Sequence, residues 1–385
     1  MPGARIKESM SGNSYMREKI FETDRMTRRE RVEATLGHRP VDRVAIHEQV
    51  SFNPGVIRMF ADREIIGFDY ALDDVCAVIS ATLDMCFPPG APRGTGTMTT
   101  PDGFVMKHDN WTSWRVSRPF NDEHGAREWM LKRMEELKAG GGGRGSAARE
   151  DYRRQFMKIQ EKIGAAVLCR FSTTGFCGVF DAMGLEIYTF FADAYPEVLA
   201  EFMEISTAKE VMRIHAVADV ELSPVILIPE DFATKQGPIF SPEFLKRYHY
   251  PYVKRLTDAW HEHGIKVIYH SDGNYKAAIP ELMGCGVDGF YCLEPACGMD
   301  VLELIALYPE MVWAGGLDGV ELMERGEPED VRREVHRHIR ESRVLDRGGM
   351  FLATSSEINP PIRPDNFKAM IMAAGELTNP DFAVV

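Results

Sequence analysis

The sequence GIKVIYHSDGN at residues 264–274 contains the pattern from which the fold class can be predicted. Its apolar run, Lys266–Tyr269, is typical of a short buried strand, and it follows a periodic helical stretch over residues 243–263. The same alternation of apolar runs and helical stretches recurs along most of the chain. Strands that alternate with helices indicate parallel pairing, and therefore an α/β fold.

Eight strand-like runs occur in the sequence, and eight is the number of strands that closes a (β/α)8 TIM barrel. An open, doubly wound sheet is the alternative, but no GxGxxG motif follows any of the runs. We therefore predict a single (β/α)8 barrel domain over residues 25–385. The expected strands are 44–46, Val75–Ala81, Ala165–Cys169, Val225–Ile228, Lys266–Tyr269, Gly289–Leu293, Met311–Ala314 and Met350–Ala353.

The N-terminal part of the chain is expected to precede the barrel. Residues 1–24 are polar and charged, and we interpret them as an N-terminal arm. A helix should follow, because Thr27 is a suitable N-cap and Glu30, three residues later, completes a capping box.

An insertion is expected over residues 95–160. Residues 95–117 alternate polar and apolar side chains around the turn Pro101-Asp102-Gly103, which predicts a β-hairpin laid over the barrel. The four glycines at 140–143 form either a flexible loop or part of a connection between two helices.

The composition excludes several classes of protein. Of the 385 residues, 44% are hydrophobic and 27% are charged, which is a globular balance. No apolar run approaches the roughly 20 residues that span a bilayer, and the polar N-terminus lacks the apolar segment of a secretory signal. The net charge of −13 argues against nucleic acid and anionic membranes as partners. Seven cysteines without a CxxC pair fit a reducing compartment, so we expect a cytoplasmic protein.

Polar side chains follow most of the expected strands. In a parallel barrel the carboxyl ends of the strands form the active site. Each acid taken alone could instead be a helix N-cap. Together, several carboxylates and two histidines on one rim would repel unless some are protonated, paired with an arginine or bound to a cation, which indicates a catalytic mouth. The candidate residues are His47, Asp84, Arg170, Glu230, Asp231, His270, Asp272, Glu294, Asp318 and Ser356.

The segment from His270 to Asn274 is the sharpest local signal. Side chains alternate along a strand, so His270 and Asp272 should point the same way. An imidazole and a carboxylate on one side can form a metal pair or an acid–base pair. The alternative is a buried histidine that bonds a neighbouring carboxylate for a structural reason.

Several short motifs are shared with a known family. They are residues 30–36 (ERVEATL), 39–44 (RPVDRV), 241–243 (SPE), 251–256 (PYVKRL), 264–273, 298–300 (GMD), 315–318 (GGLD) and 358–366. On these motifs the chain resembles the uroporphyrinogen decarboxylase superfamily from about Arg28 to the C-terminus, with poor coverage over residues 95–160. The resemblance implies a (β/α)8 barrel, in agreement with the strand count.

The superfamily contains porphyrin decarboxylases and methyltransferases that exchange methyl groups with a corrinoid protein. The decarboxylases carry an Arg-Gln-Ala-Gly-Arg motif after the first strand, whereas residues 47–52 here are HEQVSF, without the cationic clamp for a polycarboxylate. Asp84 matches a position at which the decarboxylases have an aspartate, but this one residue is not enough to identify the chain as a porphyrin decarboxylase. The chain therefore resembles the methyltransferase branch better.

Zinc-dependent members of that branch hold the metal with His-x-Cys and a distant Cys, and the matching positions here are His270, Asp272 and Ser356. The resemblance leaves two options, namely no metal, or zinc held by His270, Asp272 and Glu294, with Glu230 as a further ligand. Mixed histidine and carboxylate ligation in ether-demethylating members favours zinc, because harder ligands suit polarisation of an ether oxygen.

The resemblance thus implies an O-demethylase component that moves a methyl group from a small methoxylated or methylated compound to a corrinoid protein, with a homodimer as a common assembly. The alternatives are a cofactor-free decarboxylase, with Arg170 holding a carboxylate and Asp84 stabilising the intermediate, and a ligand-binding barrel without catalysis. We expect Glu230, Asp231 and Asp84 to be catalytic, and His47, Arg170, Asp318 and Ser356 to bind substrate.

Overall fold

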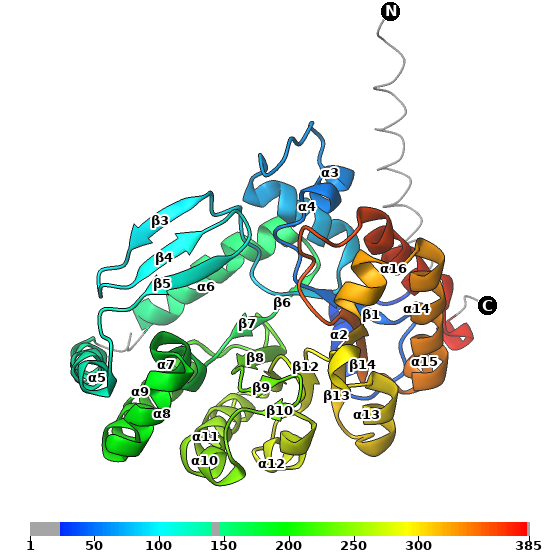
Figure 1. The fold of residues 1–385 in the computed structure, drawn as a ribbon. Coiled ribbons are helices and arrows are strands. Elements are labelled where there is room, and N and C mark those ends of the chain that lie inside the picture. Colours follow the sequence, from blue (N-terminus) through cyan, green and yellow to red (C-terminus); the bar gives the residue numbers. More distant parts are fainter. Residues whose placement is uncertain (1–23, 141–145, 383–385) are drawn as a thin grey trace, which may run out of the picture. The chain divides into compact units, whose positions relative to one another are not determined.

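The computed structural model describes residues 24–140 and 146–382. The expected polar arm over residues 1–24 lies outside this range except for Asp24, as does the glycine run beyond Gly140. Parallel strands alternate with helices in the strand order β6-β2-β1-β14-β13-β12-β11-β8-β7, which is the TIM-barrel type of α/β fold that the sequence predicts (Figure 1). None of the described helices is long and apolar enough to cross a membrane.

The chain divides into two compact units. The first contains the chain up to Pro92, residues 157–169 and everything from Gly289 onward, and the second contains residues 93–156 and 170–288. Helix α6 (Ser146–Ile163) contributes residues to both units.

The first unit contains six parallel strands among its described residues. Strands β1, β13 and β14 are buried along their whole length, as expected for a parallel sheet that is covered on both faces. The strands are β1 (Ala45–Glu48), β2 (Met85–Cys86), β6 (Val167–Leu168), β12 (Gly289–Tyr291), β13 (Val312–Leu317) and β14 (Met350–Thr354). The helices are α2 (Arg28–Leu36), α3 (Pro54–Phe60), α4 (Leu72–Thr82), α13 (Val301–Leu307), α14 (Pro328–Ser342), α15 (Val344–Arg347) and α16 (Pro364–Glu376), with helical turns at Pro295–Cys297, Gly319–Glu324 and Pro380–Phe382.

The second unit contains three parallel strands, β7 (Arg170–Phe171), β8 (Val225–Pro229) and β11 (Lys266–His270). Its short antiparallel pair is β9 (Ala233–Thr234) with β10 (Gly237–Pro238). The helices are α5 (Glu123–Ala139), α7 (Phe176–Met183), α8 (Leu185–Ala194), α9 (Pro196–Val217), α10 (Pro242–Tyr248), α11 (Tyr250–His261) and α12 (Ile279–Gly284), and a helical turn covers Lys276–Ala278.

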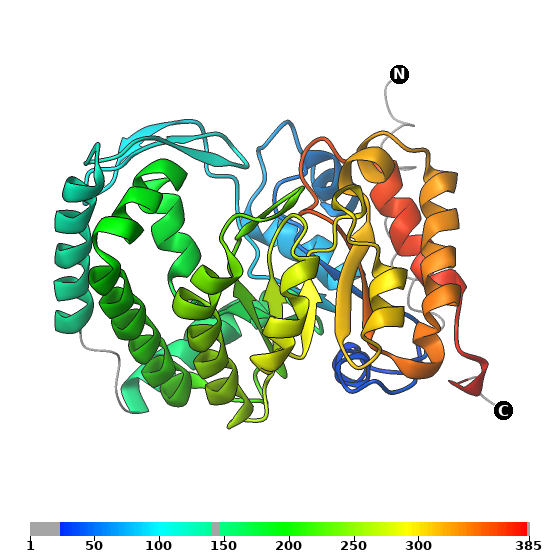
Figure 2. The ribbon, with the colours of Figure 1, turned by 60° about the horizontal axis from the view of Figure 1, so that its bottom comes forward.

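The insertion forms a three-stranded antiparallel sheet of β3 (Gly96–Thr99), β4 (Val105–His108) and β5 (Ser113–Ser117). The predicted hairpin is its first two strands, which join at the turn that contains Asp102. In Figure 2 this cyan sheet lies across the ends of the teal helix α5 and the green helices α7 to α9.

Helix α2 begins as predicted. The Glu30 N–H donates to Thr27 Oγ1 at 3.2 Å, and the Thr27 N–H donates to Glu30 Oε2 at 2.7 Å, so the capping box is complete.

The strand expected over Val75–Ala81 is wrong, because these residues lie in helix α4. The buried positions Val75, Val78, Ile79 and Thr82 are spaced by three or four residues, which places them on one face of a helix. A short apolar run does not distinguish a buried strand from a buried helix. The strand is β2, which starts after Asp84, so Asp84 precedes a strand instead of following one.

Candidate metal and active site

Asp231, His270 and Asp272 form a cluster at the carboxyl ends of β8 and β11 in the second unit. The two strands are parallel with Pro229 opposite His270, so the residues just beyond their ends meet. His270 Nε2 lies 3.3 Å from Asp231 Oδ1 and 3.7 Å from Asp272 Oδ1. The Asp272 N–H donates to Asp231 Oδ1 at 2.9 Å, which fixes the two acids relative to each other.

The cluster fits the ligand set of a catalytic zinc ion. Its three ligand atoms all lie within 4.8 Å of one another. Ligands at the usual distances from a tetrahedral zinc ion are about 3.4 Å apart, close to the observed separations. The side chain of Asp272 is 64% exposed and that of His270 is 16% exposed, so the cluster is reachable from solvent. One imidazole and two carboxylates would leave a fourth position for substrate or water.

The environment keeps Asp231 ionised. Burial by itself raises the pKa of this carboxyl, but the hydrogen bond and charge of His270, with the Asp272 N–H, hold the pKa below its ordinary value. An ionised carboxylate is the form that binds a metal.

Glu230, next to Asp231, is fully buried and anchors a loop. Its Oε1 accepts hydrogen bonds from Thr173 Oγ1, Thr174 Oγ1 and the Thr174 N–H, each at 2.7 Å. Its Oε2 accepts the Cys177 N–H in the first turn of α7, also at 2.7 Å. Burial raises the pKa of Glu230, and these four hydrogen bonds oppose that effect. Glu230 therefore positions the segment between β7 and α7.

Sequence reasoning missed two residues behind the cluster. Tyr269 Oη donates to the backbone oxygen of Glu230 at 3.0 Å and lies 2.7 Å from His249 Nε2. Burial lowers the pKa of His249 to about 3, so its imidazole is neutral. Strand alternation places Tyr269 opposite to His270, which was an available signal, whereas no local motif marks His249.

In the first unit, His47 lies in an aromatic group at the carboxyl end of β1. Its ring centroid is 4.4 Å from that of Phe87 and 5.1 Å from that of Tyr291, both with edge-on geometry. Its Nδ1 lies 3.2 Å from the Met85 backbone oxygen. These contacts fix the orientation of the imidazole.

Glu48, which follows His47, is a buried carboxyl group in its neutral form. Its Oε1 accepts the Thr354 N–H at 2.6 Å, and its Oε2 lies 3.0 Å from Thr354 Oγ1. The same hydroxyl is hydrogen-bonded to the Ser356 backbone oxygen, which can only accept. Thr354 donates to both oxygens of Glu48. Burial raises the pKa of Glu48 to about 8, although the hydrogen bonds from Thr354 oppose that effect.

Three further predicted site residues belong to the first unit. Asp318 caps the turn Gly319–Glu324 by accepting the Val320 and Glu321 N–H groups at 2.9 and 2.7 Å, which is the N-cap alternative. Glu294 Oε2 accepts the Cys297 thiol at 3.4 Å, and Ser356 Oγ donates to the Glu357 backbone oxygen at 3.3 Å. The roles of Glu294 as a zinc ligand and of Asp318 and Ser356 in substrate binding stay predictions.

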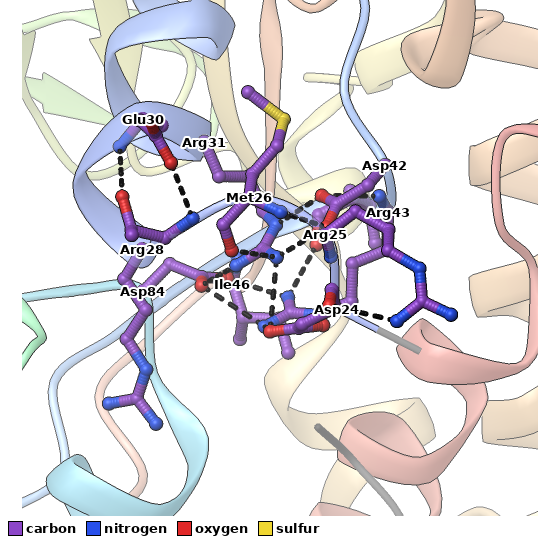
Figure 3. Close-up of polar contacts among 12 residues, drawn as sticks. Asp24, Arg25, Met26, Arg28, Glu30, Arg31, Asp42, Arg43, Ile46 and Asp84 are labelled. Carbon is purple, nitrogen blue, oxygen red and sulfur yellow. Dashed lines mark hydrogen bonds and ion pairs between the residues drawn. The ribbon is translucent and has the colours of Figure 1, made fainter. Parts of the chain in front are cut away.

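Asp84 lies at the amino end of β2 and not at a carboxyl end. Figure 3 shows it between Arg31 and Arg43. Arg31 donates to its Oδ1 and Arg43 to its Oδ2, both at 2.7 Å, and the Ile46 N–H donates to Oδ2 at 2.8 Å. Although burial opposes ionisation, the two guanidinium groups hold the pKa of Asp84 at about 2. The geometry gives Asp84 a structural role.

Arg170 is also at the amino end of its strand. The expected strand contains β6, and Arg170 follows it as the first residue of a separate strand, β7. Its guanidinium lies 5.2 Å from the Tyr152 ring centroid in α6. Arg170 therefore contacts the aromatic ring of a helix residue.

Comparisons with known proteins agree with this architecture. A family model described as uroporphyrinogen decarboxylase (URO-D) matches residues 179–377. A methyltransferase from Methanosarcina mazei has a similar structure, with a TM-score of 0.62, 16% identity, and coverage of 91% of this chain and 99% of that chain. A probable 3-DHS dehydratase from Bacillus anthracis has a TM-score of 0.30 and 12% identity, over 64% of this chain and 85% of that chain. A comparison with curated proteins gave no match. At 16% identity the methyltransferase establishes similarity of fold alone.

Proposed function

Because the chain belongs to the uroporphyrinogen decarboxylase family, we propose that it is a methyltransferase of that family. It transfers a methyl group from a small methoxylated or methylated compound to Co(I) of a separate corrinoid protein. The observation that carries the proposal is the cluster of Asp231, His270 and Asp272, which has the spacing of a zinc site. The fold shared with the Methanosarcina mazei methyltransferase supports it.

The cluster would hold zinc through His270 Nε2 and one oxygen each of Asp231 and Asp272. A bound zinc ion would polarise the donor oxygen and stabilise the charge that develops on it as the methyl group leaves. The exposed side of Asp272 provides access for the donor and for the cobalt centre of the partner.

The surrounding residues keep the cluster in place. Glu230 holds the loop before α7, and Tyr269 holds the Glu230 backbone one residue before Asp231. Such supporting hydrogen bonds orient ligands and raise metal affinity. His47, Asp318 and Ser356 remain the candidates for contact with the donor.

Cofactor-free decarboxylation finds less support. This reaction requires Arg170 to bind the carboxylate of the substrate and Asp84 to stabilise the intermediate. Arg170 stacks on Tyr152, and Asp84 is engaged by two arginines at the amino end of β2.

The test combines metal analysis with a single-turnover assay. Wild type, His270→Ala and Asp231→Asn are purified without chelator, and zinc is measured by mass spectrometry. Each protein is then mixed with free cob(I)alamin and a panel of aryl methyl ethers and methylamines, and methylcobalamin formation is followed by absorbance. We expect stoichiometric zinc and methyl transfer in the wild type only.

The surface residue His263 supplies a matched control, because it contacts His215 outside the cluster. His263→Ala should keep both zinc and activity. Undiminished zinc and methyl transfer in His270→Ala would refute the assignment. The corrinoid partner and a homodimer are then tested by gel filtration of the chain alone and with a corrinoid protein.

A further inference from the structure

The second unit contains a hollow of about 420 Å³ between the inserted sheet and the helices, and no residue of the zinc cluster lines it. This volume is in the range of small-molecule sites. Figures 1 and 2 show the sheet β3–β5 over α5 and α7 to α9, the elements that supply the walls. The lining residues include Thr100, Asp102, Phe104, Met106, Arg115, Trp129, Arg133, Gly178, Val179 and Phe202.

One part of the wall of the hollow is aromatic and apolar, and the rest is polar. Phe104 and Trp129 contact each other edge to face, with centroids 5.7 Å apart. Val179 and Phe202 complete the apolar lining from α7 and α9. Such a surface suits a planar apolar ligand.

Two arginines and one acid line the hollow. Arg115 is 18% exposed and donates to the backbone oxygen and the carboxylate of Asp181. Arg133 is 52% exposed, lies 3.7 Å from Glu136 and also interacts with the charge of Asp102. An exposed pair at that distance is weak. Arg133 is therefore the more accessible cation of the hollow, and an incoming anion would compete with Asp102 and Glu136 for it.

Gly178 in α7 provides an independent observation. A glycine inside a helix is destabilising relative to alanine. A Cβ built at Gly178 would meet no atom within 4 Å, so packing does not require glycine at this position. Gly178 lines the hollow and is exposed, and the missing side chain keeps that space open.

We propose that this hollow is an accessory binding site for a planar aromatic anion, such as an aromatic carboxylate. The ring of the ligand lies against Trp129 and beside Gly178, and its anionic group pairs with Arg133. The sheet, α5 and Gly178 lie outside residues 179–377, so the family match assigns no ligand to them.

The test uses 2-naphthoate as the probe and isothermal titration calorimetry on the full chain at low salt. Gly178→Leu fills the hollow, and we expect it to weaken binding by about tenfold or more. Arg133→Met keeps the aliphatic stem without the charge and should weaken binding about tenfold. Gly178→Ala is the matched control, because a methyl group leaves most of the space open, and it should bind like the wild type.

Three outcomes would overturn the proposal. They are no binding of 2-naphthoate to the wild type, wild-type affinity in Gly178→Leu, and equal affinity for the neutral 2-naphthamide. A thermal melt shows whether each variant is folded. His270→Ala separates this site from the zinc cluster, because 2-naphthoate binding should survive in that variant while zinc is lost. Loss of binding in His270→Ala would place the probe at the cluster and would also contradict the proposal.

Discussion

Two fully buried carboxyl groups lie at opposite ends of the strand pair β1–β2, and they are neutralised in different ways. Asp84, at the amino end, is ionised between Arg31 and Arg43. Glu48, at the carboxyl end, is bonded by the amide and hydroxyl of Thr354 and keeps its proton. The pKa of Asp84 is about 2 and that of Glu48 is about 8, because only Asp84 has cations beside it.

This difference bears on the cluster of Asp231, His270 and Asp272. Two carboxylates there share a single imidazole, which cannot neutralise both. They are neither enclosed by two arginines, as Asp84 is, nor buried enough to be protonated, as Glu48 is. Their side chains are 49% and 64% exposed, so water already screens their charges, and a bound cation would balance them further, in line with the proposed zinc ion.

The largest expected effect of pH concerns Glu48. Its ordinary pKa is 4.5 and its folded-state pKa is about 8. Between these values the folded state holds a proton that the unfolded state has released, so stability falls as pH rises from about 5 to 8. Glu48→Gln removes this dependence and keeps both hydrogen bonds to Thr354. We expect the stability difference between Glu48→Gln and wild type to grow by about 3.5 kcal/mol over this window.

Urea unfolding at pH 5 to 9 measures this difference directly. Glu48→Ala serves as the control, because it lacks the hydrogen bonds at every pH. Parallel pH profiles for Glu48→Gln and wild type would mean that Glu48 is ionised in the folded protein.

The second effect is the loss of a buried charge. Asp84→Asn leaves Arg31 and Arg43 with one negative charge fewer in a buried site, and breaking such a pair costs about 3–5 kcal/mol. The free energy of unfolding in urea gives the value. Glu33→Gln is the matched control, because its ion pair with Arg29 is 38% exposed on the Glu33 side and should contribute less than about 0.5 kcal/mol. Similar losses of unfolding free energy in Asp84→Asn and Glu33→Gln would contradict the difference between a buried and an exposed ion pair.

The third effect is the loss of stability at low pH that results from protonation of Asp84. Its pKa falls from an ordinary value of 3.8 to about 2 in the folded state, so the unfolded state binds the proton first as pH decreases. The stabilisation is complete above about pH 5 and is lost as pH falls toward 2, by about 2.5 kcal/mol. The stability gap between wild type and Asp84→Asn should therefore narrow over this range. A constant stability difference between the two proteins from pH 5 to 2 would show that the pKa of Asp84 is not lowered in the folded state.

The fold could be predicted where a strand is bounded by clear helical and polar signals. The run at Lys266–Tyr269 follows a long periodic helix and ends in polar residues, and β11 is found there. The run at Val75–Ala81 has apolar residues at helical spacing, and helix α4 is found there instead of the expected strand. Arg170 follows β6 as expected, but it also begins β7, a second strand of two residues that no signal in the sequence marks.

The site was predictable only where local spacing determines it. His270 and Asp272 are two residues apart at a strand end, so their common side follows from alternation. The hydrogen bonds of the buried Glu48 come from Thr354, a partner 306 residues away. The anchoring of Glu230 depends on Thr173, Thr174 and Cys177 across a strand pair. Neither arrangement is visible in a local motif.

The smallest expected effect on stability belongs to Asp272. Its side chain is 64% exposed and faces a second carboxylate across His270, so Asp272→Asn should change the free energy of unfolding of the metal-free protein by less than about 0.5 kcal/mol. The same substitution removes a proposed zinc ligand, so added zinc should raise the melting temperature of the wild type but not that of the variant. A side chain whose removal changes the free energy of unfolding little but weakens metal binding strongly has a functional role and not a structural one. Asp84→Asn should show the opposite pattern, with a large loss of stability and an unchanged response to zinc. Equal zinc responses in wild type and Asp272→Asn would remove Asp272 from the metal site.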